Sequence, residues 1–418
     1  MKIPNYVFPK YYSIRLIKTQ KKSIPKLGFF DDFKRYTSIQ KISEDVNNFS
    51  IQRSKNYHRI VQKLTLNQKA KYSIRIFDFT SNLNFDKKIQ YQINEKGNFT
   101  NAWRKMFEIC RQENLVPVSK KVKHFDICCM PGAFILAINH YIKTEIPGLK
   151  YDWYGQSYVD SNDKKYLTDQ LGIFKNNPSK LLVAIDGDIT NSENINYYKH
   201  YFRNKKRNLI TSDCGLKGPE TEDYTREKQM VKIFFGQFIS GISVLEKDGN
   251  FLMKFYDFFS NFYLSFVYLM GLFFKEVKLI KPESSRQPRG HEVYIGCFGF
   301  KDNLTDEVYS QLLQILQNIN ITNVLEYSLI DINNIDSELN KKIQTGVSSY
   351  YSELLKRDID ERIFTEKIIG VKLFKHTDLY IERKIQLTKL MIPKVKGYLE
   401  DYVERMDYKQ IKNKDKIN

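Results

Sequence analysis

Apolar segments that end in turn residues and alternate with helical stretches constrain this chain more than any other feature. HFDICCM at 124–130 runs directly into PGAFILAINHYI at 131–142. KYDWYGQSYV at 150–159 precedes the apolar KLLVAIDGDI at 180–189, and RNLITSDCG at 207–215 leads through a loop to a further helical stretch. Strands that alternate with helices in this way are typical of an α/β fold with a doubly wound, largely parallel sheet.

The last strands of this region break the alternation. A strand at 249–258 and an apolar helix at 261–274 are followed by EVKLIKP at 276–282 and EVYIGCFGF at 292–300, with no helix between these two. Because antiparallel strands need no helical crossover, the pattern predicts an antiparallel hairpin at one edge of the sheet.

The two flanks of the sheet region read differently from it. Residues 1–95 predict a basic, mixed extension of short strands and loops. Apolar positions recur at helical spacing in 304–319 and 386–406, so 301–418 is expected to be mostly helical, with a frayed tail at 409–418. We therefore expect an N-terminal extension at 1–95, a central domain at 96–300 and a helical region at 301–418.

The strongly positive charge of the chain favours negatively charged partners. The net charge is +19 over 418 residues. Residues 1–80 hold 17 Lys and Arg against 5 Asp and Glu, and further basic clusters stand at 120–123 and 203–208. Such surfaces attract polyanions, because each neutralised phosphate releases counterions. A solvated basic surface with no partner is the alternative that composition alone leaves open.

Cysteine use and hydropathy exclude several other classes. Five cysteines are too few and too scattered for a disulfide framework, and they do not form the pairs of a structural zinc site. A reducing, intracellular compartment is therefore expected. The N-terminus lacks the apolar core of a secretory signal, and the apolar run at 261–274 is shorter than the ~20 residues of a membrane span. We expect no contact with a membrane.

Candidate functional residues stand where the predicted strands end. Ligands of open α/β sheets bind just past the carboxyl ends of the strands. In FDICCMPGAF at 125–134, Gly132 has no Cβ and can bring its backbone close to a ligand. The spacing is neither GxGxxG nor that of a phosphate-binding loop, so those two readings are disfavoured. An ordinary strand–turn–helix is the competing interpretation.

Carboxylates follow the next two predicted strands. Asp186 and Asp188 come after an apolar run that is expected to be a buried strand. They can accept hydrogen bonds from ribose hydroxyls or an amino group, or they can cap the following turn. Asp213 stands at the end of another apolar strand, so its side chain is expected to point into the cleft.

A lysine and a glutamate complete this set. Lys254 interrupts an apolar strand, and an unpaired buried ammonium is very costly, so it must be paired or functional. Glu292 stands at the entry of the last strand, behind a loop that contains Ser284, Ser285, Arg286 and Arg289. A structural ion pair explains each residue singly. It does not explain why they all stand at one end of one sheet.

With these motifs, residues from about 100 to 300 resemble the FtsJ/RrmJ-type ribose 2′-O-methyltransferases. Within that group the similarity is greatest to the cap-specific mRNA enzymes of eukaryotes and viruses. DGDITNSENI at 186–195 and KPESSRQPRGHEVY at 281–294 carry most of it. The resemblance implies a Rossmann-like sheet, the cofactor S-adenosyl-L-methionine and methyl transfer to a ribose 2′-hydroxyl near the 5′ cap of mRNA.

The resemblance also assigns a Lys–Asp–Lys–Glu tetrad to Lys105, Asp213, Lys254 and Glu292. Lys105 comes from AWRKMFEI, where Arg104 is the rival. Lys254 would take up or orient the hydroxyl proton, and it can act as a base only if its pKa falls. Glu292 would position Lys105 and the ribose.

The remaining residues that the resemblance implies bind cofactor or RNA. Ser284, Ser285, Arg286 and Arg289 would contact RNA, and the chemistry requires no metal. The residues expected to hold the cofactor are Cys129, Met130, Pro131, Gly132, Ala133, Phe134, Asp186, Asp188 and Asp213.

Two other functions stay open at this point. The same enzyme could act on ribosomal or transfer RNA, or the chain could be an inactive RNA-binding subunit of a capping assembly. For the cap enzyme, the expected partners are capped mRNA and other capping enzymes or RNA polymerase. The expected location is the nucleus or cytoplasm, or a viral factory or virion if the source is viral.

Overall fold

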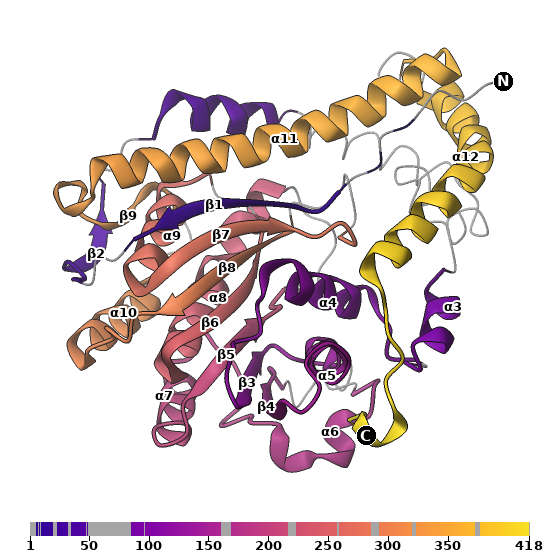
Figure 1. Ribbon diagram of the computed structural model, residues 1–418. Helices are drawn as coiled ribbons and strands as arrows, with labels where there is room; N and C mark the ends of the chain where they lie inside the picture. The colour runs from indigo at the N-terminus through magenta and orange to yellow at the C-terminus, as the bar shows by residue number, and fades with distance from the viewer. Residues whose placement is uncertain are drawn as a thin grey trace.

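A computed structural model provides the fold of the chain (Figure 1). The residues that it describes are 6, 8, 10–19, 23–31, 35–46, 48, 85–95, 97–159, 169–215, 223–256, 259–285, 292–319, 323–372 and 377–417.

A seven-stranded mixed sheet forms the centre of the molecule, in the order β1-β7-β8-β6-β5-β3-β4. The four strands β4, β3, β5 and β6 run parallel, as the alternating pattern predicts, and β8, β7 and β1 are antiparallel to their neighbours. The strands are β1 (Tyr12–Lys18), β3 (Lys121–Ile127), β4 (Lys150–Gln156), β5 (Arg207–Ser212), β6 (Leu245–Phe255), β7 (Phe274–Lys281) and β8 (Val293–Phe300).

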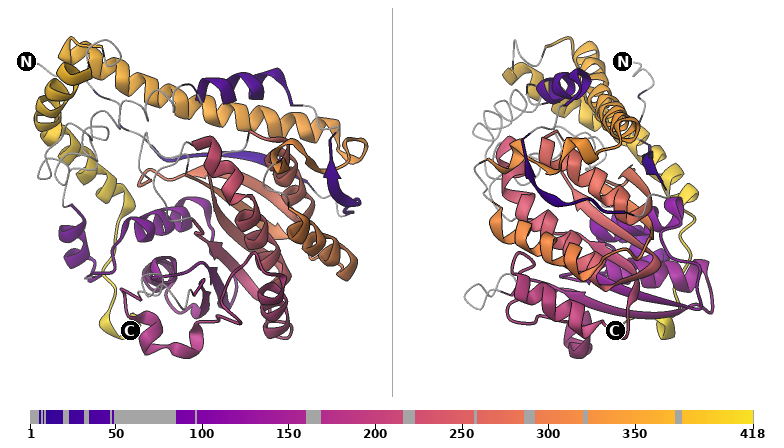
Figure 2. Two further views of the ribbon diagram at one scale, coloured as in Figure 1. Left: turned by 180° about the vertical axis from the view of Figure 1, so that it is seen from behind. Right: turned by 90° about the vertical axis from the view of Figure 1, so that its left-hand side faces the viewer.

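Helices cover both faces of this sheet (Figures 1 and 2). One face packs against α4 and α5, and the other packs against α7, α8 and α9, so the core has two layers separated by the strands. This is the α/β, doubly wound arrangement that the sequence predicts. The helices are α3 (Phe85–Gln92), α4 (Asn101–Glu113), α5 (Ala133–Glu145), α6 (Ile173–Asn176), α7 (Ser192–Tyr201), α8 (Asp223–Val244), α9 (Asn261–Phe273) and α10 (Asp306–Asn318).

The prediction of a hairpin at the sheet edge is wrong in its position. β7 and β8 do pair antiparallel, with Leu279 opposite Ile295, but β8 lies between β6 and β7. The edge is β1, in which Ile14 pairs with Leu279. A strand from the N-terminal extension therefore completes the sheet, through a pairing that spans more than 250 residues.

The predicted strand at 180–189 does not form. Leu181 makes a single parallel bridge to Gly155, and the chain then enters consecutive turns. Ile185, expected inside a buried strand, is 64% exposed. The side chains of Asp186 and Asn194 bind backbone groups of this segment, which competes with strand pairing.

The C-terminal region is helical, as predicted, and its tail is packed. α11 (Ser337–Ile369) lies across β1, and α12 (Thr377–Met406) descends from it towards α4 (Figure 1). The tail predicted to fray runs alongside α5, where the Ile411 amide donates to the Ile93 carbonyl at 3.2 Å and Ile411 is 1% exposed. Smaller elements are the β2–β9 ribbon (Leu27–Phe30 and Ser328–Ile330) and 3₁₀ turns at Pro178–Lys180, Val324–Glu326, Ile332–Asn334 and Asn413–Asp415.

The apolar run at 261–274 is the buried helix α9, in which residues 262–273 are all buried. Within the part of the chain that the structure describes, no helix has the length and apolar character needed to cross a bilayer.

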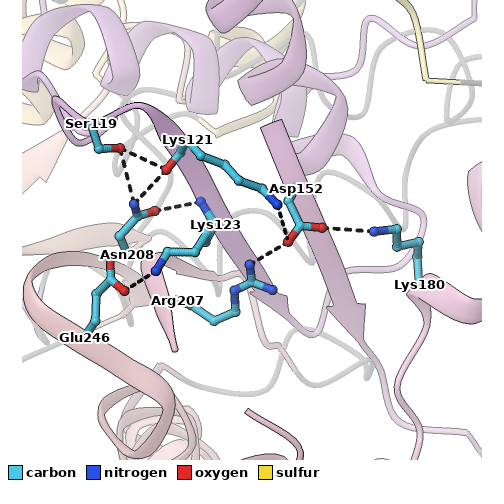
Figure 3. Close-up of polar contacts among 8 residues, drawn as sticks. All are labelled: Ser119, Lys121, Lys123, Asp152, Lys180, Arg207, Asn208 and Glu246. Carbon is cyan, nitrogen blue, oxygen red and sulfur yellow. Dashed lines mark hydrogen bonds and ion pairs between the residues drawn. The ribbon is translucent and has the colours of Figure 1, made fainter. Parts of the chain in front are cut away.

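Two basic clusters of the sequence meet at the amino ends of the parallel strands (Figure 3). Asp152 of β4 accepts from Lys180 at 3.0 Å and from Arg207 at 2.8 Å, and Lys121 lies 3.4 Å away. Beside it, Lys123 pairs with Glu246. Burial opposes ionisation of Asp152, but these cations outweigh it and hold the pKa of the carboxyl below its ordinary value.

Replacing Asp152 with asparagine is expected to lower the free energy of unfolding by about 1–3 kcal/mol at pH 7, since three cations lose their carboxylate. The pKa of Asp152 is depressed in the folded protein. Its contribution is therefore full above its unfolded pKa of about 4 and is lost as the pH falls through the lower folded value. Urea unfolding of both proteins at pH 7 and near pH 3 checks this. A difference that stays constant with pH would contradict it.

Candidate active site

The four residues of the predicted tetrad gather at the carboxyl ends of the central strands. Lys105 Nζ lies 2.6 Å from Glu292 Oε1, and Lys254 Nζ lies 2.9 Å from Asp213 Oδ1. Both lysine residues are nearly buried, at 5% and 7% exposure, whereas about a quarter of each acidic side chain is open to solvent. The site therefore presents two paired ammonium groups whose carboxylates face outward.

Tyr294 of β8 connects the two ion pairs. It is opposite Lys254 in the β6–β8 register, and its ring centroid lies 5.5 Å from Lys105 Nζ. Burial and the charges of Asp213 and Glu292 raise the pKa of its hydroxyl. Burial alone would raise the pKa of Glu292, but Lys105 and Lys254 outweigh it and depress that pKa. The four tetrad side chains therefore act on one another in a single site.

The pKa of Lys254 differs from the expectation. Burial tends to lower it, but Asp213 outweighs burial and holds the pKa of Lys254 above its ordinary value. Lys254 also donates to the backbone carbonyl of Asp213 at 2.9 Å. Lys254 is therefore a firmly held ammonium in this state. The expectation missed this because the distance to Asp213 cannot be read from sequence.

The geometry favours Lys105 over Arg104 as the residue that faces the site. Lys105 is buried and contacts Glu292, whereas Arg104 is half-buried and donates to Asn101 at 3.0 Å on its own helix. Since Thr100 caps α4 through the Trp103 amide, the first turn of the helix fixes which side chain faces the sheet.

The turn after β3 has the predicted strand–turn–helix form. The Cys129 amide donates to the Gln156 carbonyl at 2.8 Å, and the Met130 amide donates to Ser157 Oγ at 3.2 Å. Gly132, at φ +99°, precedes the first residue of α5. A Cβ on Gly132 would overlap the side chain of Ile173. This glycine is thus required by its conformation and by packing against α6, and the expectation that its missing Cβ makes room for a ligand is not supported by the packing.

The structure shows one of the two roles that the sequence left open for the acidic turn, since both carboxylates bond within the turn itself. Asp186 Oδ1 accepts from the Asp188 amide at 2.9 Å and from Asn194 at 2.6 Å, and Asp188 Oδ1 accepts from the Thr190 amide at 2.8 Å. One oxygen of each carboxylate therefore shapes the turn. The other oxygen of each makes no hydrogen bond within the described ranges, and both side chains are half-buried.

A disulfide joins the turn after β3 to the end of β5, contrary to the expectation from cysteine spacing. Cys128 and Cys214 are bonded, with their Cα atoms 5.1 Å apart. They are 86 residues apart in sequence, so the pairing depends on β3 and β5 being neighbours. Because Cys214 follows Asp213 directly, the bond places the predicted cofactor turn beside the tetrad.

Thiol titration of the denatured protein is expected to find three reactive thiols before reduction and five after it. The three free cysteines are Cys110, Cys129 and Cys297, and the sequence contains five in all. A Cys214→Ser variant, which breaks the bond, should show four thiols without reduction. Five thiols in the unreduced wild-type protein would contradict the disulfide.

The loop after β7 turns its serines towards the protein. Ser284 Oγ donates to Glu108 Oε2 at 2.6 Å, and Ser285 Oγ donates to Glu292 Oε1 at 3.3 Å. Ser284 and Ser285 were predicted to contact RNA. In the structure their hydroxyls donate to Glu108 and Glu292 instead, so the structure gives no support to that prediction. Arg286 and Arg289 lie outside the described residues.

Sequence reasoning missed two buried acids next to this site. Glu108 lies on α4, one helical turn after Lys105. Asp126 of β3 is 1% exposed and accepts from Thr211 at 2.6 Å, and burial raises the pKa of its carboxyl. The signal for Asp126 was an acid inside the apolar strand HFDICCM. Across the described residues, no group of three or more His, Cys, Asp or Glu side chains is arranged to hold a metal ion.

Comparison with known proteins places this geometry in context. Residues 99–300 match the FtsJ-like methyltransferase family. The chain is 29% identical over 323 residues to "Probable methyltransferase EP424R" of African swine fever virus, covering 74% of this chain and 70% of that one. It is 28% identical over 317 residues to "Uncharacterized protein L511" of Acanthamoeba polyphaga mimivirus (71% and 39% covered). It is also 28% identical over 236 residues to "Cap-specific mRNA (nucleoside-2'-O-)-methyltransferase 2" of Drosophila melanogaster (51% and 33% covered).

Proposed function

We propose that this chain transfers a methyl group to a ribose 2′-hydroxyl near the 5′ cap of mRNA, because residues 99–300 match the FtsJ-like methyltransferase family. The observation that carries the proposal is the meeting of the two lysine–carboxylate pairs at the strand ends. Relatives named as cap-specific mRNA 2′-O-methyltransferases support the choice of substrate.

S-adenosyl-L-methionine, when bound, would supply a methyl group activated by its sulfonium. The residues present fit such a group. Asp186 and Asp188 each keep one carboxylate oxygen that could accept from ribose hydroxyls or an amino group. We propose that these two acids, Asp213 and the segment 129–134 hold the cofactor. The disulfide supports this, because it keeps that segment next to Asp213.

Lys254 would act on the hydroxyl as a charged donor. A protonated amine cannot accept a proton, but it can donate a hydrogen bond to the 2′-oxygen and leave a lone pair directed at the methyl group. Such alignment supplies several kcal/mol of the barrier reduction. The hydroxyl proton becomes acidic as the carbon–oxygen bond forms, so it can be lost to solvent water at the partly open site after methyl transfer rather than before it.

Glu292 and Lys105 would hold the ribose in place. Glu292 is ionised, since its depressed pKa keeps it charged at neutral pH, and its partly open side chain can accept from a sugar hydroxyl. Lys105 fixes the orientation of that carboxylate at 2.6 Å. We further propose that the protein works inside the cell together with other capping enzymes or RNA polymerase, which the viral and eukaryotic relatives support.

Comparing methyl transfer to capped and uncapped transcripts of one sequence tests the proposal. Transfer that requires the cap is expected. Equal transfer to both, or preference for ribosomal or transfer RNA, would instead assign another RNA substrate to the same chemistry. If calorimetry shows that the protein binds RNA but not S-adenosyl-L-methionine, the chain is a binding subunit and the proposal fails.

A further inference from the structure

Helix α4 contacts the described residues on either side of Arg286 and Arg289, two of the residues that the sequence analysis assigned to RNA. After these arginines, Glu292 binds Lys105 at 2.6 Å. Before them, the amides of Glu283 and Ser284 donate to the carboxylate of Glu108 at 2.6 and 3.0 Å, and Ser284 Oγ adds a third bond at 2.6 Å. Because Lys105 and Glu108 are three residues apart, they share one face of the helix.

The C-terminal helix α12 also contacts Glu108 and Glu283. Tyr402 donates to Glu108 Oε2 at 3.2 Å. Arg405 donates to both oxygens of Glu283, at 2.8 and 3.1 Å. Glu108 is 1% exposed and Tyr402 is 3% exposed, so water does not compete for the bond between these two side chains. A helix from outside the methyltransferase domain therefore helps to fix Glu283 and Ser284.

The chemistry of Glu108 is unusual for a residue that only fills space. Burying a carboxylate is costly unless it is fully hydrogen-bonded, and an apolar side chain would pack at lower cost. Burial raises the pKa of Glu108 to about 7, although its bonds to Ser284 and Glu283 pull it down. Its four acceptor contacts all go to Glu283, Ser284 and α12, so the carboxylate fixes the position of these two residues.

We propose that Glu108, supported by Tyr402, is a positioning residue of the methyl-transfer site. It holds Glu283 and Ser284 so that the adjacent Ser285 bonds to Glu292, which faces Lys105, and capped RNA can bind. The inference rests on the proposed function. It also gives the C-terminal region a role, since α12 completes the polar shell around this carboxylate. Glu108 touches neither reacting group, so its effect is on RNA affinity.

Glu108→Gln in the full chain tests this, because glutamine keeps the size but faces amide donors with its own NH₂ group. We expect the dissociation constant and the KM for capped RNA to rise about tenfold or more, while S-adenosyl-L-methionine affinity stays the same and kcat falls less than the affinity does. Tyr402→Phe, which removes one of the four bonds, should shift RNA affinity in the same direction by a smaller factor.

Glu113→Gln is the matched control. Glu113 is a buried acid on the same helix, paired with Lys278 at 2.9 Å and Tyr11 at 2.7 Å and not with the loop. It should lower the melting temperature without weakening RNA binding. If Glu108→Gln weakens RNA binding no more than Glu113→Gln does, the inference is wrong. RNA affinity is measured separately from turnover, so a wild-type protein that binds capped RNA without methylating it would overturn the proposed function alone.

Discussion

Replacing Lys254 with alanine is expected to lower methyl transfer to capped RNA by about a thousandfold or more. Lys254 is one of the two buried ammonium groups of the site. Asp213 holds it at 2.9 Å, and no other described cation is paired with that carboxylate. Losing the group that aligns the 2′-hydroxyl removes both orientation and charge, and such groups typically contribute 10²–10⁴ in rate. Initial rates with labelled cofactor measure the change.

The control for this variant is Lys278→Ala on the neighbouring region of the sheet. Lys278 pairs with the buried Glu113 at 2.9 Å, so its removal also leaves an acid without its cation. We expect a lower melting temperature in both variants but a large loss of rate in Lys254→Ala alone. A folded Lys254→Ala protein that keeps the wild-type rate would refute the tetrad.

Replacing Gly187 with alanine is expected to weaken S-adenosyl-L-methionine binding at least tenfold. Gly187 stands between Asp186 and Asp188 at φ +77°, and an added Cβ would overlap the carbonyl oxygen of Ser157. That oxygen belongs to the backbone, so the acidic turn must move. Displacements of about 1 Å in a binding site are enough for losses of this size. Isothermal calorimetry measures the affinity.

Gly172→Ala separates backbone strain from the overlap. Gly172 has a similar φ of +72°, but a Cβ there would meet no atom within 4 Å. It should lose about 1–2 kcal/mol of stability from the left-handed conformation, with cofactor affinity unchanged. If both variants bind the cofactor as tightly as the wild-type protein, the acidic turn is not part of the cofactor site.

Asp213, Lys254 and Glu292 could be singled out from local patterns, whereas Lys105 and the grouping of all four came from the family resemblance. Parallel strands place their carboxyl ends at one edge of the sheet, so Asp213 and Lys254 were expected at that edge, and the pairing of β5 with β6 makes them neighbours. The lysine inside the apolar β6 required a partner, and Asp213 is that partner. The alternation of strands and helices likewise predicted the parallel strands of the sheet, because such connections place helices between neighbouring strands.

The features that were missed depend on contacts distant in sequence. β1 pairs with β7 across more than 250 residues, and the seven residues of β1 contain no pattern that identifies β7 as its partner. The disulfide between Cys128 and Cys214 needed the order of β3 and β5. Glu108 reads as an ordinary polar residue of α4 until Ser284 and Tyr402 are seen beside it.

The failed strand at 180–189 has a different cause. Its apolar residues matched a buried strand, but Asp186 and Asn194 bind the backbone of the segment and turn it away from the sheet. Side-chain competition of this kind is local, and the sequence DGDITNSENI contains both side chains involved. The prediction therefore gave the hydrophobic pattern too much weight, although the residues that form the turn were present in the sequence.

Mass spectrometric mapping of the methylated nucleotide on a capped RNA tests the account most directly. The account predicts one added methyl group on a ribose of the first transcribed nucleotides, which disappears when that ribose is replaced by 2′-deoxyribose. A methyl group on a base or on the cap guanine, or one that persists on the 2′-deoxy substrate, would contradict it.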